Sequence, residues 1–248
     1  MRVTALLLPG LDGTGELFSG ASPRPELALT IVDYPREQPV AREVLIDRIL
    51  AALPSEGPVV LVGESFSGPL ALEVAARVPG LVGVVLLASF ARSPRARPLI
   101  RLIAWLGRWL FARAPPRFAV RWLMTGRAPA LIERVRRIVL AVSSAVLRDR
   151  LVQIARVDAR EPLRTCPAPV LALVAKHDRL VPRRAITSLL ALRPDLRVVT
   201  LPGPHLLFQH DPDAVLGAIV EWLRALVVAD AQARPRDSAF SGGSADRP

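Results

Sequence analysis

The stretch Val-Val-Leu-Val-Gly-Glu-Ser-Phe-Ser-Gly-Pro-Leu-Ala-Leu, residues 59–72, decides the fold of this chain. Its four leading apolar residues predict a short buried strand, and the apolar spacing from Pro69 onward predicts a helix. The turn between them is Gly-Glu-Ser-Phe-Ser-Gly, residues 63–68. A serine on so tight a turn has its hydroxyl held out at the carboxyl end of the strand, as a nucleophile requires. Ser65 is therefore the candidate nucleophile.

The turn matches the pattern Gly-x-Ser-x-Gly except at its last position, where Ser67 stands and Gly68 follows. That position must be small because the helix packs close to the strand there, and serine is the next smallest polar choice. The same residues also fit a strand-turn-helix in which the serine is an ordinary helix cap. The rest of the chain has to decide between these two interpretations.

Apolar runs alternate with helical spacing over most of the chain. Besides residues 59–62, the runs expected as strands are 3–8, 29–34, 81–88, 170–174 and 196–201. The stretches expected as helices are 40–53, 66–78, 183–192 and 213–228. This alternation predicts an α/β fold with a mostly parallel sheet of about six strands, covered by helices on both faces. The functional site of such a sheet lies at the carboxyl ends of its strands.

The alternation breaks after Ser89. Residues 92–156 contain no strand-like run and consist of helical stretches divided by prolines. We therefore expect a helical cap at 92–156, inserted into a core made of residues 1–91 and 157–229. Residues 230–248 are rich in Ala, Arg, Pro, Asp, Ser and Gly without periodicity, which predicts a disordered tail.

The most distinctive stretch of the expected cap is residues 98–113. Its Leu, Ile, Trp and Phe side chains surround a narrow polar face that holds Arg101 and Arg108. The stretch is short for a membrane span. Two interpretations stay open: a helix packed on a neighbouring helix, or an interfacial helix that faces anionic lipid.

The formal net charge of +11 is concentrated in the expected cap. From Arg92 to Arg156 there are fifteen arginines and two acids, whereas the remainder carries eighteen basic and twenty acidic residues. Lys176 is the only lysine, and a coding bias explains the arginines as readily as phosphate recognition does. No nucleic-acid recognition motif accompanies the charge, so we expect no nucleic-acid binding. A peripheral contact of the cap with an anionic membrane or an acidic carrier stays open.

The single cysteine, Cys166, excludes an internal disulfide, and no C-x-x-C or His/Cys cluster suggests a metal. A reducing, cytoplasmic compartment and no cofactor are the simplest inferences. The apolar start of the chain breaks at Pro9 and Gly10, too early for the core of a signal peptide, and we expect it to form the first strand.

Three loops at the same predicted sheet edge carry the groups that acyl transfer requires. Ser65 would attack, His205 would remove its proton and return it to the leaving group, and Asp178 would orient the imidazole. The chain order Ser, Asp, His is expected when the acid follows a later strand and the histidine follows the last.

Each of these residues has an alternative. Asp178 also fits an ordinary turn residue, His177 precedes it, and His210 is expected as a cap at the start of the final helix. His205 is favoured because it follows the Gly-Pro turn after the last strand. The rival serines, neither at the apex of the turn, are Ser67 and Ser89.

The loop Pro-Gly-Leu-Asp-Gly-Thr-Gly, residues 9–15, can bring backbone N–H groups close to a ligand because glycine removes the Cβ. It lacks the Gly-Lys-Ser/Thr ending of a P-loop and the dinucleotide spacing Gly-x-Gly-x-x-Gly. An oxyanion-binding turn fits better, with the backbone N–H groups of Leu11 and Phe66 as donors.

Taken together, these motifs resemble those of the α/β-hydrolase superfamily over residues 3–90 and 160–228. The matching segments are residues 8–15, residues 63–68, Asp178-x-x-Val181-Pro182 and Gly203-Pro204-His205. The resemblance implies that fold with a working Ser-His-Asp triad. The chain has Pro-Gly at residues 9 and 10 where many members have His-Gly, and it starts at what would be the family's third strand, so the resemblance implies an N-terminally short version of the fold.

These features predict a serine hydrolase that cleaves a small-molecule ester or thioester of a hydrophobic acyl group through an acyl-enzyme. The apolar, tryptophan-bearing cap suggests the acyl chain, because a cap over the strand ends shapes the pocket and excludes water. An acyltransferase is the nearest alternative, and the glycine-rich loop is similar to that of some plastid lipid acyltransferases. A non-catalytic binding protein, or a membrane-surface protein that uses the basic cap, is the alternative from a different class.

Overall fold

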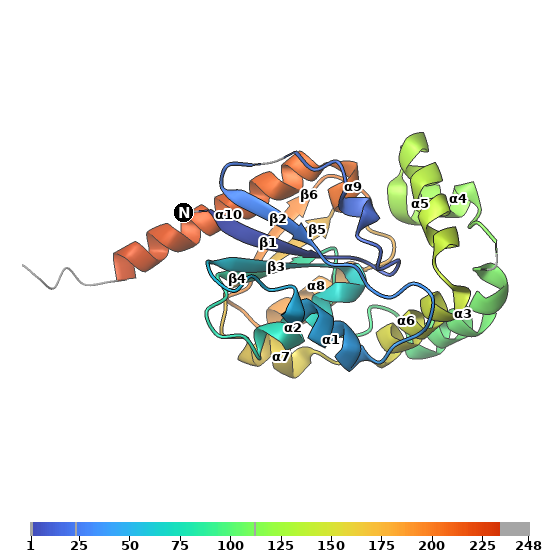
Figure 1. Ribbon diagram of the computed structural model, residues 1–248, viewed down its shortest axis with the longest axis horizontal. Helices are drawn as coiled ribbons and strands as arrows, with labels where there is room; N and C mark the ends of the chain where they lie inside the picture. The colour runs from blue at the N-terminus through green and yellow to red at the C-terminus, as the bar shows by residue number, and fades with distance from the viewer. Residues whose placement is uncertain (1, 23, 112, 234–248) are drawn as a thin grey trace, which may run out of the picture.

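Six parallel strands form one sheet in the order β2-β1-β3-β4-β5-β6 (Figure 1). The structure is a computed structural model and describes residues 2–22, 24–111 and 113–233. The strands are β1 Val3–Leu8, β2 Leu27–Ile31, β3 Val59–Glu64, β4 Gly83–Leu87, β5 Val170–Ala175 and β6 Arg197–Leu201. Helices flank this sheet, so the predicted α/β class is confirmed.

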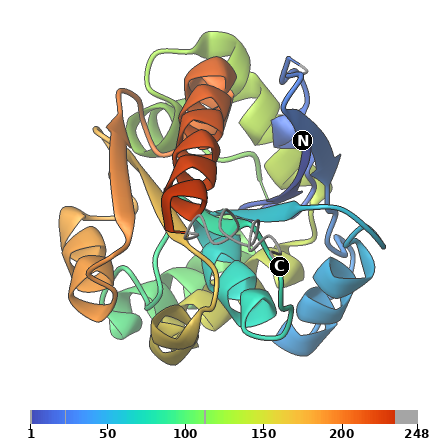
Figure 2. The same cartoon turned by 90° about the vertical axis from the view of Figure 1, so that its left-hand side faces the viewer.

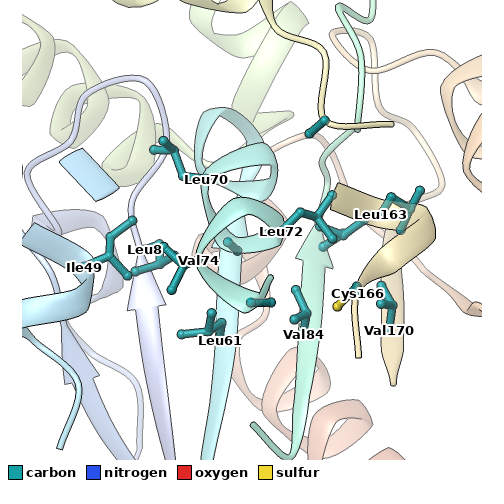
Figure 3. Close-up of a cluster of buried hydrophobic side chains, with 14 of the residues drawn as sticks. Leu8, Ile49, Leu61, Leu70, Leu72, Val74, Val84, Leu163, Cys166 and Val170 are labelled. Atoms are coloured by element: carbon teal, nitrogen blue, oxygen red, sulfur yellow. The ribbon is translucent and has the colours of Figure 1, made fainter. Parts of the chain in front are cut away.

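Both faces of β3 are buried because helices cover the sheet on each side. The side chain of Leu61 lies in one apolar cluster, whereas Val60 and Val62 lie in the other, as the two-residue period of a strand requires. Helices α1 Arg42–Ala51, α2 Gly68–Ala75, α7 Arg160–Thr165 and α8 Arg183–Leu192 cover the first face, and α10 Pro212–Ala233 covers the second (Figure 2). Figure 3 shows Leu61 and Val84 of the sheet beneath the α2 side chains.

Several element boundaries differ from the expectation. Strand β2 ends at Ile31 because the chain then bends toward the glycine-rich loop, where the Tyr34 N–H donates to the Gly13 carbonyl at 2.7 Å. The expected helix 66–78 begins as a 3₁₀ turn at Ser65–Ser67 and continues as α2. Helix α10 continues to Ala233, past the residue where we expected a tail to begin. The rest of that expected tail, 234–248, lies outside the described residues.

Residues 92–156, which we call the cap segment, are mainly helical. Its elements are α3 Arg97–Leu110, α4 Arg117–Val120, a π-helical turn η3 Arg121–Thr125, α5 Pro129–Ala141 and α6 Ser144–Arg156. They lie beyond the carboxyl ends of the strands (Figure 1). Within the parts of the chain that the structure describes, no helix has the length and apolar composition needed to cross a membrane.

Candidate active site

Ser65 stands on a strained turn between β3 and α2. Its backbone φ is 47°, in the left-handed region that residues with a side chain rarely adopt, and such strain is typical of functional sites. A Cβ at Gly63 would lie 2.7 Å from the Ser67 carbonyl oxygen, and one at Gly68 would lie 1.9 Å from Ser89 Oγ. The tight packing against Ser89 that requires a glycine is therefore at Gly68. This explains why Ser67 is tolerated in the usual place of a glycine.

Ser67 ties this turn to the glycine-rich loop. Its buried hydroxyl donates to the carbonyl oxygen of Pro9, and so the Tyr34 hydroxyl, 2.9 Å away, donates to Ser67 Oγ. Burial raises the pKa of Tyr34, so that the phenol keeps the proton it donates. The serine at position 67 therefore has a structural partner on each side.

Ser65, His205 and Asp178 form one hydrogen-bonded chain. His205 Nε2 lies 3.0 Å from Ser65 Oγ, and His205 Nδ1 lies 2.8 Å from Asp178 Oδ2. The other carboxylate oxygen of Asp178 accepts from the backbone N–H groups of Leu180 and Val181, each at 2.8 Å. The carboxylate thus fixes Nδ1 as the protonated nitrogen and leaves Nε2 free to accept from the serine.

The rival residues occupy other positions. Ser89 Oγ donates to the Ser65 carbonyl at 2.5 Å and so supports the turn from behind. His210 ends the short helix α9 Leu207–His210 and does not begin the final helix as expected; the Asp211 side chain caps α10 by accepting from the Ala214 N–H. The structure thus brings the predicted set of Ser65, Asp178 and His205 together.

The two N–H groups expected to bind an oxyanion lie at the same sheet edge. Leu11 follows β1 and Phe66 follows β3, and these strands are neighbours whose ends pair Leu8 with Gly63. The Phe66 N–H belongs to the first turn of a helix, where N–H groups have no intrahelical acceptor. Their role as oxyanion donors stays a prediction.

Arg150 of α6 is a site residue that the sequence did not reveal. Its buried guanidinium donates from Nη1 to the Leu11 and Asp12 carbonyls at 2.9 and 2.7 Å, and from Nη2 to the Pro35 carbonyl at 2.8 Å. The guanidinium carbon also lies 5.7 Å from the centre of the Tyr34 ring. The cap segment therefore holds the loop that carries Leu11. No pattern distinguishes Arg150 from the other cap arginines, because all its acceptors are distant in sequence.

Glu64, directly before Ser65, is the second such residue. It is buried, and its Oε2 accepts from Gln209 Nε2 at 3.2 Å. Glu64 Oε1 and Gln209 Oε1 have no hydrogen-bond partner among the described residues. Burial raises the pKa of Glu64 to about 7; the Gln209 hydrogen bond and His205 oppose this rise, and Asp12 adds to it. A carboxyl that holds a proton near neutral pH thus lies behind the candidate nucleophile.

The cap segment covers the acid and base loops with apolar groups. The Leu206 N–H, next to His205, donates to the Met124 carbonyl at 3.0 Å, and the Arg179 guanidinium lies 4.6 Å from the centre of the Trp122 ring. Leu206 packs in a cluster whose other members are Leu17, Val120, Leu131, Ile132, Val135 and Ile138. In contrast, a cleft of about 350 Å³ lined by residues 90–96 and part of α8 includes none of the three hydrogen-bonded side chains.

Nothing in the described parts of the chain forms a metal site: no group of three or more His, Cys, Asp or Glu side chains there is placed to hold an ion. The arrangement offers a serine hydroxyl, an imidazole that accepts its proton and a carboxylate that orients the imidazole. These are the groups of nucleophilic acyl transfer.

The chain belongs to the alpha/beta hydrolase family, whose family model matches residues 2–218. The resemblance seen in the sequence is thereby confirmed. The chain is 28% identical over 237 residues to the biotin biosynthesis bifunctional protein BioHC of Cellvibrio japonicus (strain Ueda107). That alignment covers 89% of this chain and 45% of the relative, so the chain spans about half the length of the curated protein it matches.

Solved structures with the same fold include several hydrolases. The enol-lactonase from Burkholderia xenovorans LB400 superposes with a TM-score of 0.75 at 17% identity, covering 90% of this chain and 92% of that one. A lipase-esterase related protein from Clostridium acetobutylicum ATCC 824 gives 0.73 at 18% identity, with 88% and 93% coverage. A thermophilic esterase from Thermogutta terrifontis gives 0.71 at 22% identity, with 91% and 90% coverage. At these identities the likeness establishes the fold alone.

Proposed function

We propose that this member of the alpha/beta hydrolase family is a serine hydrolase that cleaves a carboxylic ester or thioester through an acyl-enzyme. The observation that carries the proposal is the hydrogen-bonded chain from Ser65 Oγ through His205 to Asp178, with distances of 3.0 and 2.8 Å. These distances lie within the range a general base needs to take a proton from a nucleophile.

In this mechanism Ser65 Oγ attacks the acyl carbon while His205 Nε2 takes the hydroxyl proton. The carboxylate of Asp178 orients the imidazole and stabilises the imidazolium that forms. The N–H groups of Leu11 and Phe66 stabilise the oxyanion, and loss of one such donor typically lowers kcat by about 10²–10³-fold. His205 then passes the proton to the leaving alcohol or thiol, and a water molecule activated by the same imidazole releases the acid.

The proposed substrate carries a hydrophobic acyl group. Support comes from the apolar cluster that includes Leu206, the residue after His205. Met124 adds to it, because its carbonyl accepts a hydrogen bond from the Leu206 N–H. Apolar packing beside the His205 loop favours a hydrophobic acyl group and limits the access of bulk water to the intermediate. Among esters of increasing chain length, we expect kcat/KM to rise from acetate to a medium-chain acyl group.

A fluorophosphonate probe tests the mechanism, because it phosphonylates only a serine activated by a neighbouring base. We expect an adduct on Ser65, none in Ser65→Ala, and a labelling rate lowered at least about a hundredfold in His205→Ala. Ser188→Ala, which changes an exposed serine on α8, is the matched control and should label normally. Undiminished labelling of Ser65→Ala would refute the proposal.

A further inference from the structure

Helix α3 turns a broad apolar face outward. Leu99, Leu102 and Leu106, spaced to share one face of a helix, are exposed, with 51% of Leu102 accessible. Trp105 on the flank of this face is 70% exposed. Helix α3 packs on α6, and among its described side chains the buried Ile100 and Ala104, with Gly107, lie on the face opposite Leu102. Packing on a neighbour, one of the two interpretations of this stretch, thus accounts for only part of its apolar surface.

Two further large side chains are exposed at the same end of the molecule. Phe118 of α4 is 74% exposed and Trp122 of η3 is 62% exposed, and α4 lies at the same end of the molecule as α3 (Figure 1). Isolated exposed apolar residues are common, but a continuous helix face of this kind marks an interaction surface. We call the exposed residues of α3, Leu99, Leu102, Trp105 and Leu106, the apolar ridge.

Exposed arginines lie on the same part of the chain as the apolar ridge. Arg97 and Arg101 are exposed on α3, and Arg113 and Arg121 are exposed on the segments that follow. The only acids between residues 92 and 156 are Glu133 and Asp149. The partner must therefore present negative charge around an apolar surface that accepts a convex helix.

We propose that α3 and the apolar ridge dock the cap segment onto the surface of an anionic lipid bilayer. Leucine and tryptophan side chains would enter the boundary between headgroups and acyl chains, and the arginines would bind lipid phosphates. A second copy of the chain fits less well, because joining two such surfaces would bring like charges together. The cap lies beyond the carboxyl ends of the strands, so docking turns the end of the molecule that holds Ser65 toward the membrane.

Vesicle flotation tests this docking. The intact protein should float with vesicles of phosphatidylcholine mixed with phosphatidylglycerol, and should stay behind with phosphatidylcholine alone. Replacing both Leu102 and Trp105 by Gln should lower the partition coefficient at least about tenfold, because two apolar side chains no longer enter the bilayer. Arg97→Gln with Arg101→Gln should lower it severalfold and reduce its dependence on salt.

Matched controls come from the opposite end of the molecule. Val227→Gln changes an equally exposed apolar residue on α10, and Arg77→Gln changes an exposed arginine just after α2; neither should affect flotation. Equal recovery with both vesicle types, or full recovery of the Leu102/Trp105 variant, would overturn the proposal. A different outcome would also overturn it: the protein does not float, but it forms a concentration-dependent dimer that the same double substitution abolishes. A second copy of the chain would then cover the ridge. Fluorophosphonate labelling in solution shows that each variant is folded, so a failed flotation leaves the hydrolase proposal intact.

Discussion

Ser67 shows how a single side chain can replace a motif glycine and add a function of its own. Its hydroxyl links the turn that carries Ser65 to Pro9 of the glycine-rich loop, with Tyr34 as the outer partner. The two loops that bear the proposed oxyanion donors are therefore joined through one buried oxygen. The geometry of the site depends on this link as well as on the three hydrogen-bonded residues themselves.

Removing the Ser67 hydroxyl should destabilise the fold. In Ser67→Ala the Pro9 carbonyl and the Tyr34 hydroxyl lose their buried partner, and an unpaired buried group costs about 1–3 kcal/mol. We expect the free energy of unfolding in urea to fall by about 2 kcal/mol. The control, Ser188→Ala at an exposed position, should change it little; equal midpoints for both variants would show that the link contributes nothing to stability.

Glu64 should make the stability of the protein depend on pH in an unusual direction. Its folded pKa of about 7 lies above the ordinary value of 4.5, so between these pH values the unfolded state releases a proton that the folded state keeps. The destabilising contribution is absent below about pH 4.5, grows as the pH rises toward 7, and is complete above it.

Glu64→Gln removes this contribution because the amide does not ionise at either pH. The difference in free energy of unfolding between Glu64→Gln and the parent protein should therefore grow by a few kcal/mol as the pH rises from about 5 to about 8. Urea denaturation at the two pH values measures the difference. Glu73→Gln does not serve as a control because Glu73 pairs with Arg42, so the exposed Glu56→Gln is used and should show no such trend. A constant difference at both pH values would argue against a proton on Glu64.

At the scale of elements, the main coupling runs from α6 to the glycine-rich loop. Arg150 holds three carbonyl groups of two chain segments, so the position of a cap helix determines the position of the loop that carries Leu11. A shift of α6 would therefore also shift the proposed oxyanion donor on Leu11.

Replacing Arg150 by Met should slow the reaction more than it weakens substrate binding. The loop that carries the Leu11 N–H is no longer held, so kcat for an ester substrate should fall at least about tenfold while KM changes little. Affinity for a boronic acid that mimics the tetrahedral intermediate should fall in parallel.

Arg148→Met on the same helix is the control for Arg150→Met. Among the described residues Arg148 donates to the Ala104 carbonyl of α3 and contacts no part of the glycine-rich loop by a hydrogen bond, so its loss should leave kcat unchanged. Equal effects of both substitutions on kcat and on the melting temperature would mean that Arg150 acts only through the stability of the cap segment.

The elements that sequence periodicity predicted best are those whose ends are locally defined. Helix α8 runs from Arg183 to Leu192 as expected, because Pro182 precedes its first residue. Strand β2 was displaced because its end depends on a hydrogen bond to Gly13, far away in the chain. The same contrast holds in the site: Ser65, Asp178 and His205 each stand in a loop with a recognisable pattern, whereas Arg150 and Glu64 obtain their partners only through the folded chain.

Across the whole molecule, charge and apolar surface are divided unevenly. The cap segment carries the arginine excess and the apolar ridge, whereas the rest of the chain has slightly more acidic than basic residues. The sequence showed this charge asymmetry directly, because it depends on composition alone. Exposure of the ridge was not predictable, because the same apolar spacing on α3 also fits a helix whose long side chains are all buried against α6.

The order of strands in the sheet also bears on how the protein is made. Strands β4 and β5 lie side by side, yet the whole cap segment separates Leu87 from Val170 in the chain. On the ribosome, β1 to β4 emerge first and can pair with one another. The outer edge of β4 stays unpaired until β5, which is translated much later, becomes available. The nascent chain thus passes through a stage with an open, valine- and leucine-rich strand edge, the kind of surface that recruits chaperones and promotes aggregation. We therefore expect slow translation of the cap segment to prolong this exposure and to lower the yield of soluble protein.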